Sequence, residues 1–205
     1  MKNLFILFIA IFMAANSAFA QHAVSALTYQ SQVSGLFLTS EDFQAHKISH
    51  TDARIRLNEF LNSANISVTE NGKTIRFAKK DIYAYRDQHG RDFRFQNNLR
   101  YRILDTTGFY LYENPLSVPA GKGRVLVPAY YFSVTPGTPL QALSLRNLRR
   151  AFAQDVSFLD QIDNKFNNDA ALASFDEINH GYKLQRAYKR AEEELLSAHN
   201  QMQSR

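Results

Sequence analysis

Three consecutive segments decide the fold of this chain: ISVTENGKTIRF (66–77), IYAYRDQHGRDFRF (82–95) and LRYRILDTTGFYLY (99–112). Each segment holds two short runs rich in β-branched and aromatic residues on either side of a turn sequence, which is typical of a β-hairpin. The dipeptide Asn71-Gly72 readily takes the positive φ angles of a two-residue hairpin turn. Gly72, Gly90 and Gly108 fall 18 residues apart, so the hairpins recur at a regular spacing. The sequence therefore predicts an antiparallel β-meander in the middle of the chain.

Weaker signals flank this meander. Ser40 fits the N-cap of a short helix, and residues 51–60 fit either a strand or a helix. After the meander, prolines and glycines in residues 115–123 indicate a longer loop. Residues 125–134 (VLVPAYYFSV) then indicate a last strand, with Pro128 at an edge or a bulge.

The apolar period becomes helical beyond residue 139. We expect a first helix capped by Ser144, a second opened by Asp155, and a longer one over about residues 170–198. Gly181 lies inside this last helix and should weaken or kink it, since glycine costs about 1 kcal/mol relative to alanine.

Strands followed by helices predict an α+β fold. In this fold an antiparallel β-meander, either open or closed into a small barrel, carries a C-terminal helical segment on one face. We expect a β domain over residues 21–136 and the helices over residues 137–205, packed together as one globular unit.

The first twenty residues have the pattern of a cleaved export signal. Lys2 precedes the apolar run LFILFIAIFMAA (4–15), and Ala18-Phe19-Ala20 has the small-x-small form of a cleavage site. The run is shorter than the roughly 20 apolar residues of a membrane span. We therefore expect cleavage between Ala20 and Gln21, and an exported protein, periplasmic or extracellular, with no membrane span after signal removal.

Composition narrows the chemistry further. The chain has no cysteine, which excludes disulfides, Cys-ligated zinc, a thiol nucleophile and a lipid anchor on an N-terminal cysteine. Export without disulfides indicates a bacterial protein held together by its core alone. The net charge is +5 and is unevenly distributed, because residues 73–102 are rich in Lys and Arg while residues 155–177 are rich in Asp and Glu.

Three parts of the chain carry a resemblance to other proteins: GLFLTSEDF (35–43), KDIYAYRD (80–87) with GRDFRF (90–95), and LRNLRRAF (145–152). They are similar to a group of uncharacterised exported proteins of Bacteroidota. The resemblance implies an exported location and a shared fold. It implies no activity and no functional residue.

No standard catalytic signature occurs, such as G-x-S-x-G, H-E-x-x-H, S-x-x-K or a phosphate-binding glycine loop. The sequence predicts no cofactor. The best metal candidate is the pair His46 and His50 with Asp52, because on a helix the i, i+4 spacing would bring two nitrogens and an oxygen to one zinc ion. The alternative is a pair of solvated histidines on a loop.

The most specific candidate site is a face of the predicted meander. Strand alternation places Ile75, Phe77, Phe93, Phe95, Phe109 and Leu111 toward the core. The opposite positions carry arginines and tyrosines: Arg76, Arg94, Arg100, Arg102, Tyr83, Tyr85, Tyr110 and Tyr112. Guanidinium groups pair with phosphate or sulfate and tyrosines stack on a base or sugar ring, so this face fits a polyanion or a glycan. Alternatively, the tyrosines form cross-strand pairs or lie under a helix, and the basic residues meet the acids of 155–177.

Together these patterns predict an exported, non-enzymatic module that binds a macromolecule of the cell envelope or the medium. A nucleic acid is a poor candidate partner for an exported chain. The alternatives are a hydrolase or metal-dependent enzyme acting on envelope polymers through residues such as His46, His50 and Asp52, and a structural subunit that self-associates.

Overall fold

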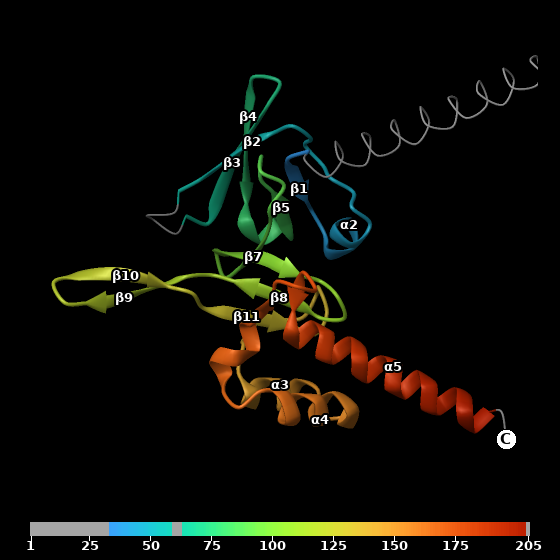
Figure 1. The fold of residues 1–205 in the computed structure, drawn as a ribbon. Helices are drawn as coiled ribbons and strands as arrows, with labels where there is room; N and C mark the ends of the chain where they lie inside the picture. The colour runs from blue at the N-terminus through green and yellow to red at the C-terminus, as the bar shows by residue number, and fades with distance from the viewer. Residues whose placement is uncertain (1–32, 59–62, 204–205) are drawn as a thin grey trace, which may run out of the picture.

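The computed structural model describes residues 33–58 and 63–203 (Figure 1). The predicted signal segment, with its cleavage site between Ala20 and Gln21, lies outside the described residues and stays a prediction. Within the described part of the chain, no helix combines the length and the apolar character that crossing a membrane requires.

A seven-stranded antiparallel sheet forms the centre of the molecule, in the order β1-β5-β6-β7-β8-β11-β12. Its strands are β1 (Gly35–Phe37), β5 (Ala84–Arg86), β6 (Asp92–Gln96), β7 (Leu99–Asp105), β8 (Tyr110–Glu113), β11 (Tyr130–Ser133) and β12 (Gln141–Ala142). The sheet is open, with β1 and β12 at its two edges. The α+β prediction is therefore confirmed, and the barrel alternative is wrong.

The first predicted hairpin belongs to a separate three-stranded sheet. Strands β2 (Arg54–Leu57), β3 (Asn65–Glu70) and β4 (Lys73–Ala78) pair in that order, so the ambiguous segment 51–60 contributes a strand. Asn71 and Gly72, at φ 50° and 75°, form the two-residue turn between β3 and β4. The other two hairpins are β5–β6 and β7–β8, and all three predicted hairpins are confirmed.

The segment after the meander differs from the prediction. Strands β9 (Leu116–Ala120) and β10 (Gly123–Val127) form a hairpin of their own that pairs with no other described strand. We call this hairpin, residues 116–127, the β9–β10 arm, and it projects away from the rest of the molecule (Figure 1). The predicted strand 125–134 is thus two strands, β10 and β11, because Pro128 between them has no amide hydrogen to continue a ladder.

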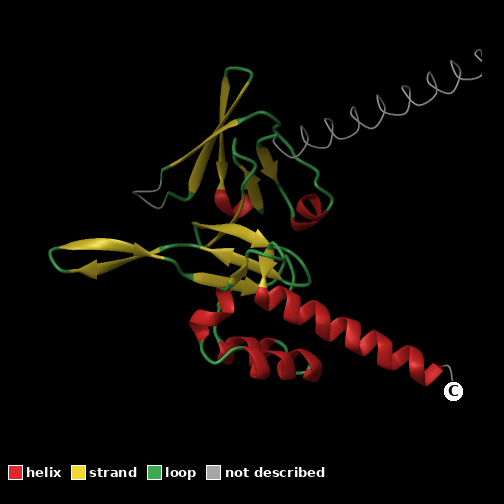
Figure 2. Ribbon diagram, in the orientation of Figure 1, coloured by secondary structure: helices red, strands yellow, loops and turns green. Residues whose placement is uncertain are grey.

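The helices of the C-terminal part gather at one end of the seven-stranded sheet (Figure 2). Helix α3 (Leu145–Ala151) is capped by Ser144 and α4 (Val156–Lys165) by Asp155, as predicted. The short α2 (Ser40–Gln44) is capped by Thr39, one residue earlier than expected, in a capping box with Asp42. Strand β12 lies beyond the domain boundary predicted at residue 136, yet it pairs with β11.

The predicted helix over residues 170–198 is wrong in its first half. Residues Asp169–Ala173 form a 3-10 turn (η2), and β13 (Phe175–Asp176) pairs with β14 (Gly181–Tyr182) before α5 runs over Lys183–Gln203. The carboxylate of Asp176 accepts hydrogen bonds from the backbone amides of Ile178 and Asn179, both at 3.1 Å. An acidic side chain that bonds the backbone two and three residues on stabilises a turn at the expense of a helix.

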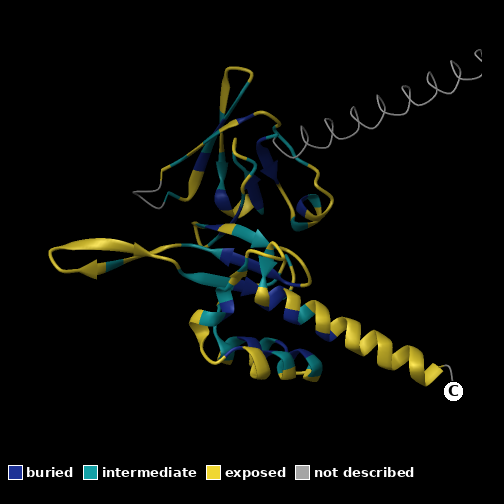
Figure 3. Ribbon diagram, in the orientation of Figure 1, coloured by how far each residue is buried: buried dark blue, intermediate teal, exposed yellow. Residues whose placement is uncertain are grey.

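Three apolar clusters surround the central sheet. Phe109 and Phe132 pack against α3, α4 and α5 through residues such as Phe152, Phe158 and Leu184. A second cluster joins β1, β5 and β6 to the three-stranded sheet, and a third places α2 against Phe37, Tyr101, Tyr110 and Tyr112. The outer half of α5, residues 192–203, lies entirely outside these clusters and is exposed (Figure 3).

Candidate arginine face of the three-stranded sheet

The predicted single arginine and tyrosine face does not form. Residues paired directly across neighbouring strands point to the same face of a sheet. Phe93 pairs with Arg102 and Phe95 with Arg100, so these two arginines share a face with the phenylalanines. Arg94 pairs with Tyr101 and points to the opposite face. The prediction that all eight side chains lie together, away from the core, is therefore wrong.

Arg94 belongs to the interior. Only 6% of the residue is exposed, and its guanidinium donates to the Tyr112 phenol at 3.0 Å, the Ser133 hydroxyl at 3.2 Å and the Thr138 carbonyl at 2.9 Å. The same guanidinium lies 5.1 Å from the ring centre of Tyr83. Among the described residues no carboxylate pairs with it, so neutral acceptors and aromatic rings stabilise this buried charge.

The tyrosines of the predicted face are also packed. Tyr85 stacks on Phe93 with ring centroids 5.0 Å apart, and its phenol accepts a hydrogen bond from Arg100. Tyr110 is buried beside Tyr112. Burial raises the pKa of Tyr83 and of Tyr110 above the ordinary value for a phenol. None of the four tyrosines presents an open ring to a sugar or a base.

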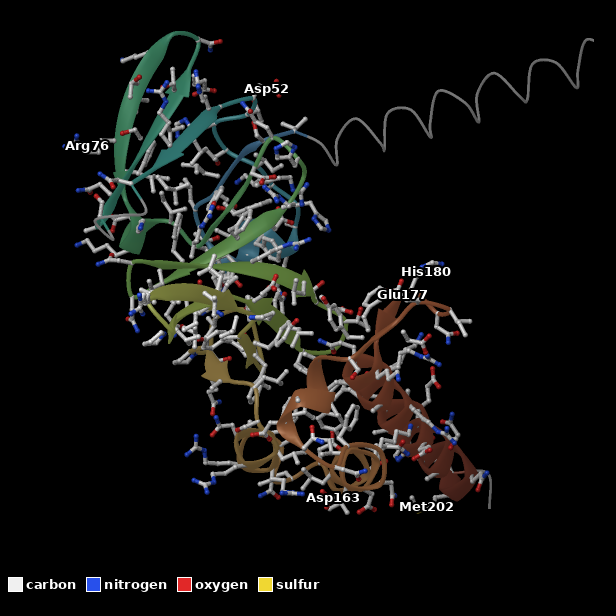
Figure 4. All side chains as sticks on the ribbon, turned by 60° about the vertical axis from the view of Figure 1, so that its left-hand side comes forward. Asp52, Arg76, Asp163, Glu177, His180 and Met202 are labelled. Carbon is white, nitrogen blue, oxygen red and sulfur yellow. The ribbon has the colours of Figure 1, made fainter. Side chains whose placement is uncertain are left out.

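The two remaining arginines lie apart from each other. Arg102 is half exposed on β7 and lies 3.8 Å from the carboxylate of Glu113. Arg76 lies on the other sheet and projects away from the body of the molecule (Figure 4). Of the predicted ligand-binding residues, Arg76 alone stands on an open face without a carboxylate partner among the described residues.

The predicted metal site is not assembled. His46, His50 and Asp52 have positive φ angles of 53°, 54° and 56°, so they lie in a loop after α2 and share no helical face. The Nδ1 of His50 pairs with the Glu70 carboxylate at 3.0 Å, and its ring packs on Phe77. The described residues contain no group of three or more His, Asp or Glu side chains placed to hold a metal ion. The enzyme alternative thereby loses the residues on which it was based.

Arg76 has neighbours that the sequence did not single out. In the three-stranded sheet Arg56 pairs with Ser67, and Ser67 pairs with Arg76. Arg54 lies two residues before Arg56 on the same strand and therefore on the same face. We call this surface the outer arginine face; its members are Arg54, Arg56, Ser67, Thr69, Thr74 and Arg76.

The sequence folds this way because of a simple alternation. In β3, Ile66 and Val68 are buried against the central sheet, so Ser67 and Thr69 point outward. In β2 the order R-I-R-L places Ile55 and Leu57 inward and both arginines outward, where they are exposed. This alternation was the available signal for Arg54 and Arg56, but the ambiguity between strand and helix over residues 51–60 concealed it.

The outer arginine face carries positive charge alone. The only carboxylate in the three strands is that of Glu70, which pairs with His50. Arg54, Arg56 and Arg76 form no ion pair with any described residue. The hydroxyls of Thr69 and Thr74 are hydrogen-bonded to each other at 2.8 Å beside them. Strand geometry spaces the arginines by about 7 Å along β2 and about 10 Å across β3.

A second cationic surface lies in a groove of about 890 Å³ between the end of α4 and α5. Its charged lining comprises Lys165, Lys183, Arg186, Lys189 and Arg190 together with Asp176 and Glu193. Most of these bases are paired within the fold, because Arg186 meets Asp176, Lys189 meets Glu193 at 4.0 Å, and Arg190 meets Glu194 at 3.1 Å. The groove therefore has less unpaired positive charge than the outer arginine face.

Comparison of the chain with protein-family models, with curated proteins and with solved structures gives no match. The geometry of the outer arginine face is therefore the basis for a functional proposal.

Proposed function

We propose that this chain is an exported, non-enzymatic module that binds an anionic polymer of the cell envelope or the medium on its outer arginine face. The observation that carries the proposal is the cluster Arg54, Arg56 and Arg76, which shares one exposed sheet face with hydroxyl side chains and no carboxylate. Export rests on the signal pattern ending at Ala20.

The side chains of this face are suited to recognising a ligand by its negative charge. A guanidinium offers paired donors that match the oxygens of phosphate, sulfate or carboxylate groups, and serine and threonine hydroxyls add further donors. Three arginines on one exposed face offer several guanidinium groups at once, so the face fits a polymer that presents charges in a row. The face carries no aromatic ring on which a neutral sugar could stack.

The test is a binding assay with three charged polymers and one neutral one. Dextran sulfate, polyphosphate and polygalacturonate present sulfate, phosphate and carboxylate groups on different backbones, and dextran carries none. We expect binding to at least one charged polymer and none to dextran. The variant Arg54→Glu/Arg56→Glu/Arg76→Glu should lower that affinity by at least tenfold, since each lost pairing with a phosphate-like group is worth about 1 kcal/mol or more.

The matched control reverses two charges in the groove, Lys165→Glu/Lys183→Glu. Like the three arginines of the outer arginine face, these two lysines are exposed and have no ion pair within the described residues. Unchanged affinity in the control with a loss in the triple variant supports the proposal. An equal loss of affinity in both variants would show that the polymer is attracted to the net positive charge of the protein. Unchanged affinity in the triple variant would show that the outer arginine face is not the binding site.

Export has its own test. The protein expressed with its leader in a bacterial host should be recovered outside the cytoplasm with Gln21 as its first residue, as N-terminal sequencing would show. An uncleaved chain in the cytoplasmic fraction would contradict this part of the proposal and leave the polymer-binding test unaffected.

A further inference from the structure

The β9–β10 arm has two faces of different character. Leu116 pairs with Val127 and Val118 with Val125, so these four aliphatic side chains lie together on one face. The other face carries Ser117, Pro119, Arg124 and Leu126. There the guanidinium of Arg124 donates to the side chain and the carbonyl of Ser117, which braces the hairpin across its two strands.

Nothing in the described part of the chain covers the aliphatic face. Leu116 is 46% exposed, Val125 47% and Val127 36%, and no residue of the arm belongs to any of the three apolar clusters. Among the strands that the structure describes, none pairs with the arm. A two-stranded hairpin is only marginally stable alone in water, so an arm of this composition gains stability when its aliphatic face is removed from water.

The charged residues of the arm are all cationic. Lys122 occupies the turn and Arg124 follows it, and no Asp or Glu occurs between Glu113 and Asp155. Two arms placed face to face would bring like charges together and bury only four aliphatic side chains from each copy, far below the 1,200 Å² or more of a stable interface. A surface that is apolar within and anionic at its boundary complements both the aliphatic face and the cationic tip.

We propose that the β9–β10 arm rests with its aliphatic face on an anionic lipid surface, while Lys122 in the turn reaches the phosphate headgroups. The chain then binds a membrane peripherally and without spanning it. Long cationic side chains beside an apolar face adopt this arrangement at bilayer boundaries. This contact is independent of the outer arginine face, which is built from other strands.

The chain contains no tryptophan, so a single introduced indole reports its own surroundings. The test uses the predicted mature chain, residues 21–205, because the apolar run 4–15 would itself bind lipid, and this chain keeps every described residue. Three variants place the probe on the aliphatic face (Val125→Trp), on the opposite face (Leu126→Trp) and on the exposed half of α5 (Leu196→Trp).

Vesicles of phosphatidylcholine with added phosphatidylglycerol should shift the emission of Val125→Trp to shorter wavelength. The shift should be smaller for Leu126→Trp and absent for Leu196→Trp, and pure phosphatidylcholine vesicles should give little change in any of them. Equal shifts at all three positions, or no shift at Val125→Trp, would overturn the proposal.

Sedimentation with the same vesicles measures affinity without the probe. Lys122→Gln should lower partitioning about fivefold, the effect expected for one cationic side chain at an anionic surface. Arg124→Gln, on the face away from the lipid, should lower it less. Lys165→Gln/Lys183→Gln removes two exposed charges that belong to neither proposed site and should leave partitioning unchanged. Loss of vesicle binding in Arg54→Gln/Arg76→Gln, with binding unchanged in Lys122→Gln, would assign the membrane contact to the outer arginine face and overturn the role of the arm.

The competing explanation is that a second copy of the chain covers the aliphatic face of the arm. Size-exclusion chromatography across a concentration series should show one species without lipid, and Leu116→Ser/Val127→Ser should not alter it while abolishing vesicle binding. Because no arm residue lies in an apolar cluster, this double variant should keep the wild-type melting transition. A wild-type dimer that the double variant dissociates would assign the aliphatic face to a second copy of the chain.

Discussion

The guanidinium of Arg94 donates a hydrogen bond of 3.0 Å to the phenolic oxygen of Tyr112, although strand β7 separates the strands that carry them. The Tyr112 oxygen in turn lies 2.9 Å from the Ser133 hydroxyl on β11. The network thus joins β6, β8 and β11 across one face of the sheet and reaches the Thr138 carbonyl in the following loop. It explains how a charged side chain is buried without a carboxylate partner among residues 33–58 and 63–203.

Removing one acceptor from this network should lower stability. Tyr112→Phe keeps the ring but leaves the buried guanidinium with one partner fewer, so the free energy of unfolding should fall by about 1–3 kcal/mol. Urea denaturation followed by circular dichroism measures the change. Tyr130→Phe is the matched control, because Tyr130 is only partly buried, and it should change the free energy by less than about 0.5 kcal/mol. Equal values for the two variants would contradict the role of the network.

Gly108 should tolerate no side chain. It has φ +80°, and a Cβ atom there would overlap the ring of Tyr188 on α5. Gly72→Ala provides the control, because Gly72 has a similar φ of +75° and open space around it. Both variants carry the backbone penalty of a positive φ, and Gly108→Ala should lose about 1–3 kcal/mol more through overpacking. Thermal melting of the two variants side by side would test the difference.

Asp87 should make the free energy of unfolding depend on pH in the acidic range. Burial alone would raise the pKa of its carboxyl, but hydrogen bonds from Arg91 and His89 outweigh burial and lower it. Because the folded pKa lies below the unfolded pKa of about 3.8, the ionised carboxylate stabilises the folded protein at pH values above 3.8. This stabilisation is lost as the pH falls through the folded pKa. Asp87→Asn should therefore destabilise the protein by on the order of 1 kcal/mol at pH 7.

The control for Asp87 is the same comparison at low pH. The difference between wild type and Asp87→Asn, measured by urea denaturation, should shrink well below pH 3.8 as the wild-type carboxyl becomes protonated. A difference that is constant from pH 7 to the acid limit would show that the asparagine acts through packing and not through charge.

Polymer binding on the outer arginine face should weaken steeply with salt. Each arginine that pairs with a polymer charge releases a bound counterion, so removing one should reduce the slope of log affinity against log salt by about one unit. Arg54→Gln, Arg56→Gln and Arg76→Gln, titrated with the best polymer at several salt concentrations, should each show this change. A slope that stays at the wild-type value in all three would place the contact elsewhere.

Local turn and cap chemistry made much of this fold predictable. Asn71-Gly72 and the segments around Gly90 and Gly108 form hairpins because the turn residues themselves prefer these conformations. Ser144 and Asp155 cap helices because their side chains accept hydrogen bonds from the first turn. The prediction of a helix over 170–198 was wrong around Asp176. Its side chain accepts hydrogen bonds that stabilise a turn, and the helical period of the apolar residues does not reveal this.

The binding face was less predictable, because both faces of the central sheet are partly covered. Strand alternation separates Arg94 from Phe93 correctly, but it does not say that α2 and the tyrosines cover one face while a second sheet covers the other. Alternation also holds only within a regular strand. Tyr83 precedes β5 and lies by Arg94, whereas Tyr85 within β5 stacks on Phe93.

Helix α5 is anchored at one end only. Leu184, Ala187 and Ala191 hold its first turns against the core, and every residue from 192 to 203 faces solvent. The tertiary contacts of this stretch are exposed hydrogen bonds from Ser157 and Gln161 of α4 to Glu194. A short helical stretch held so weakly frays, because its backbone hydrogen bonds barely offset the entropy of ordering it. Amide hydrogens beyond Ala191 should therefore exchange with deuterium far sooner than those of residues 184–191. The C-terminus is accordingly the natural place for a label or a fusion partner, since attachment there disturbs none of the packed sheets.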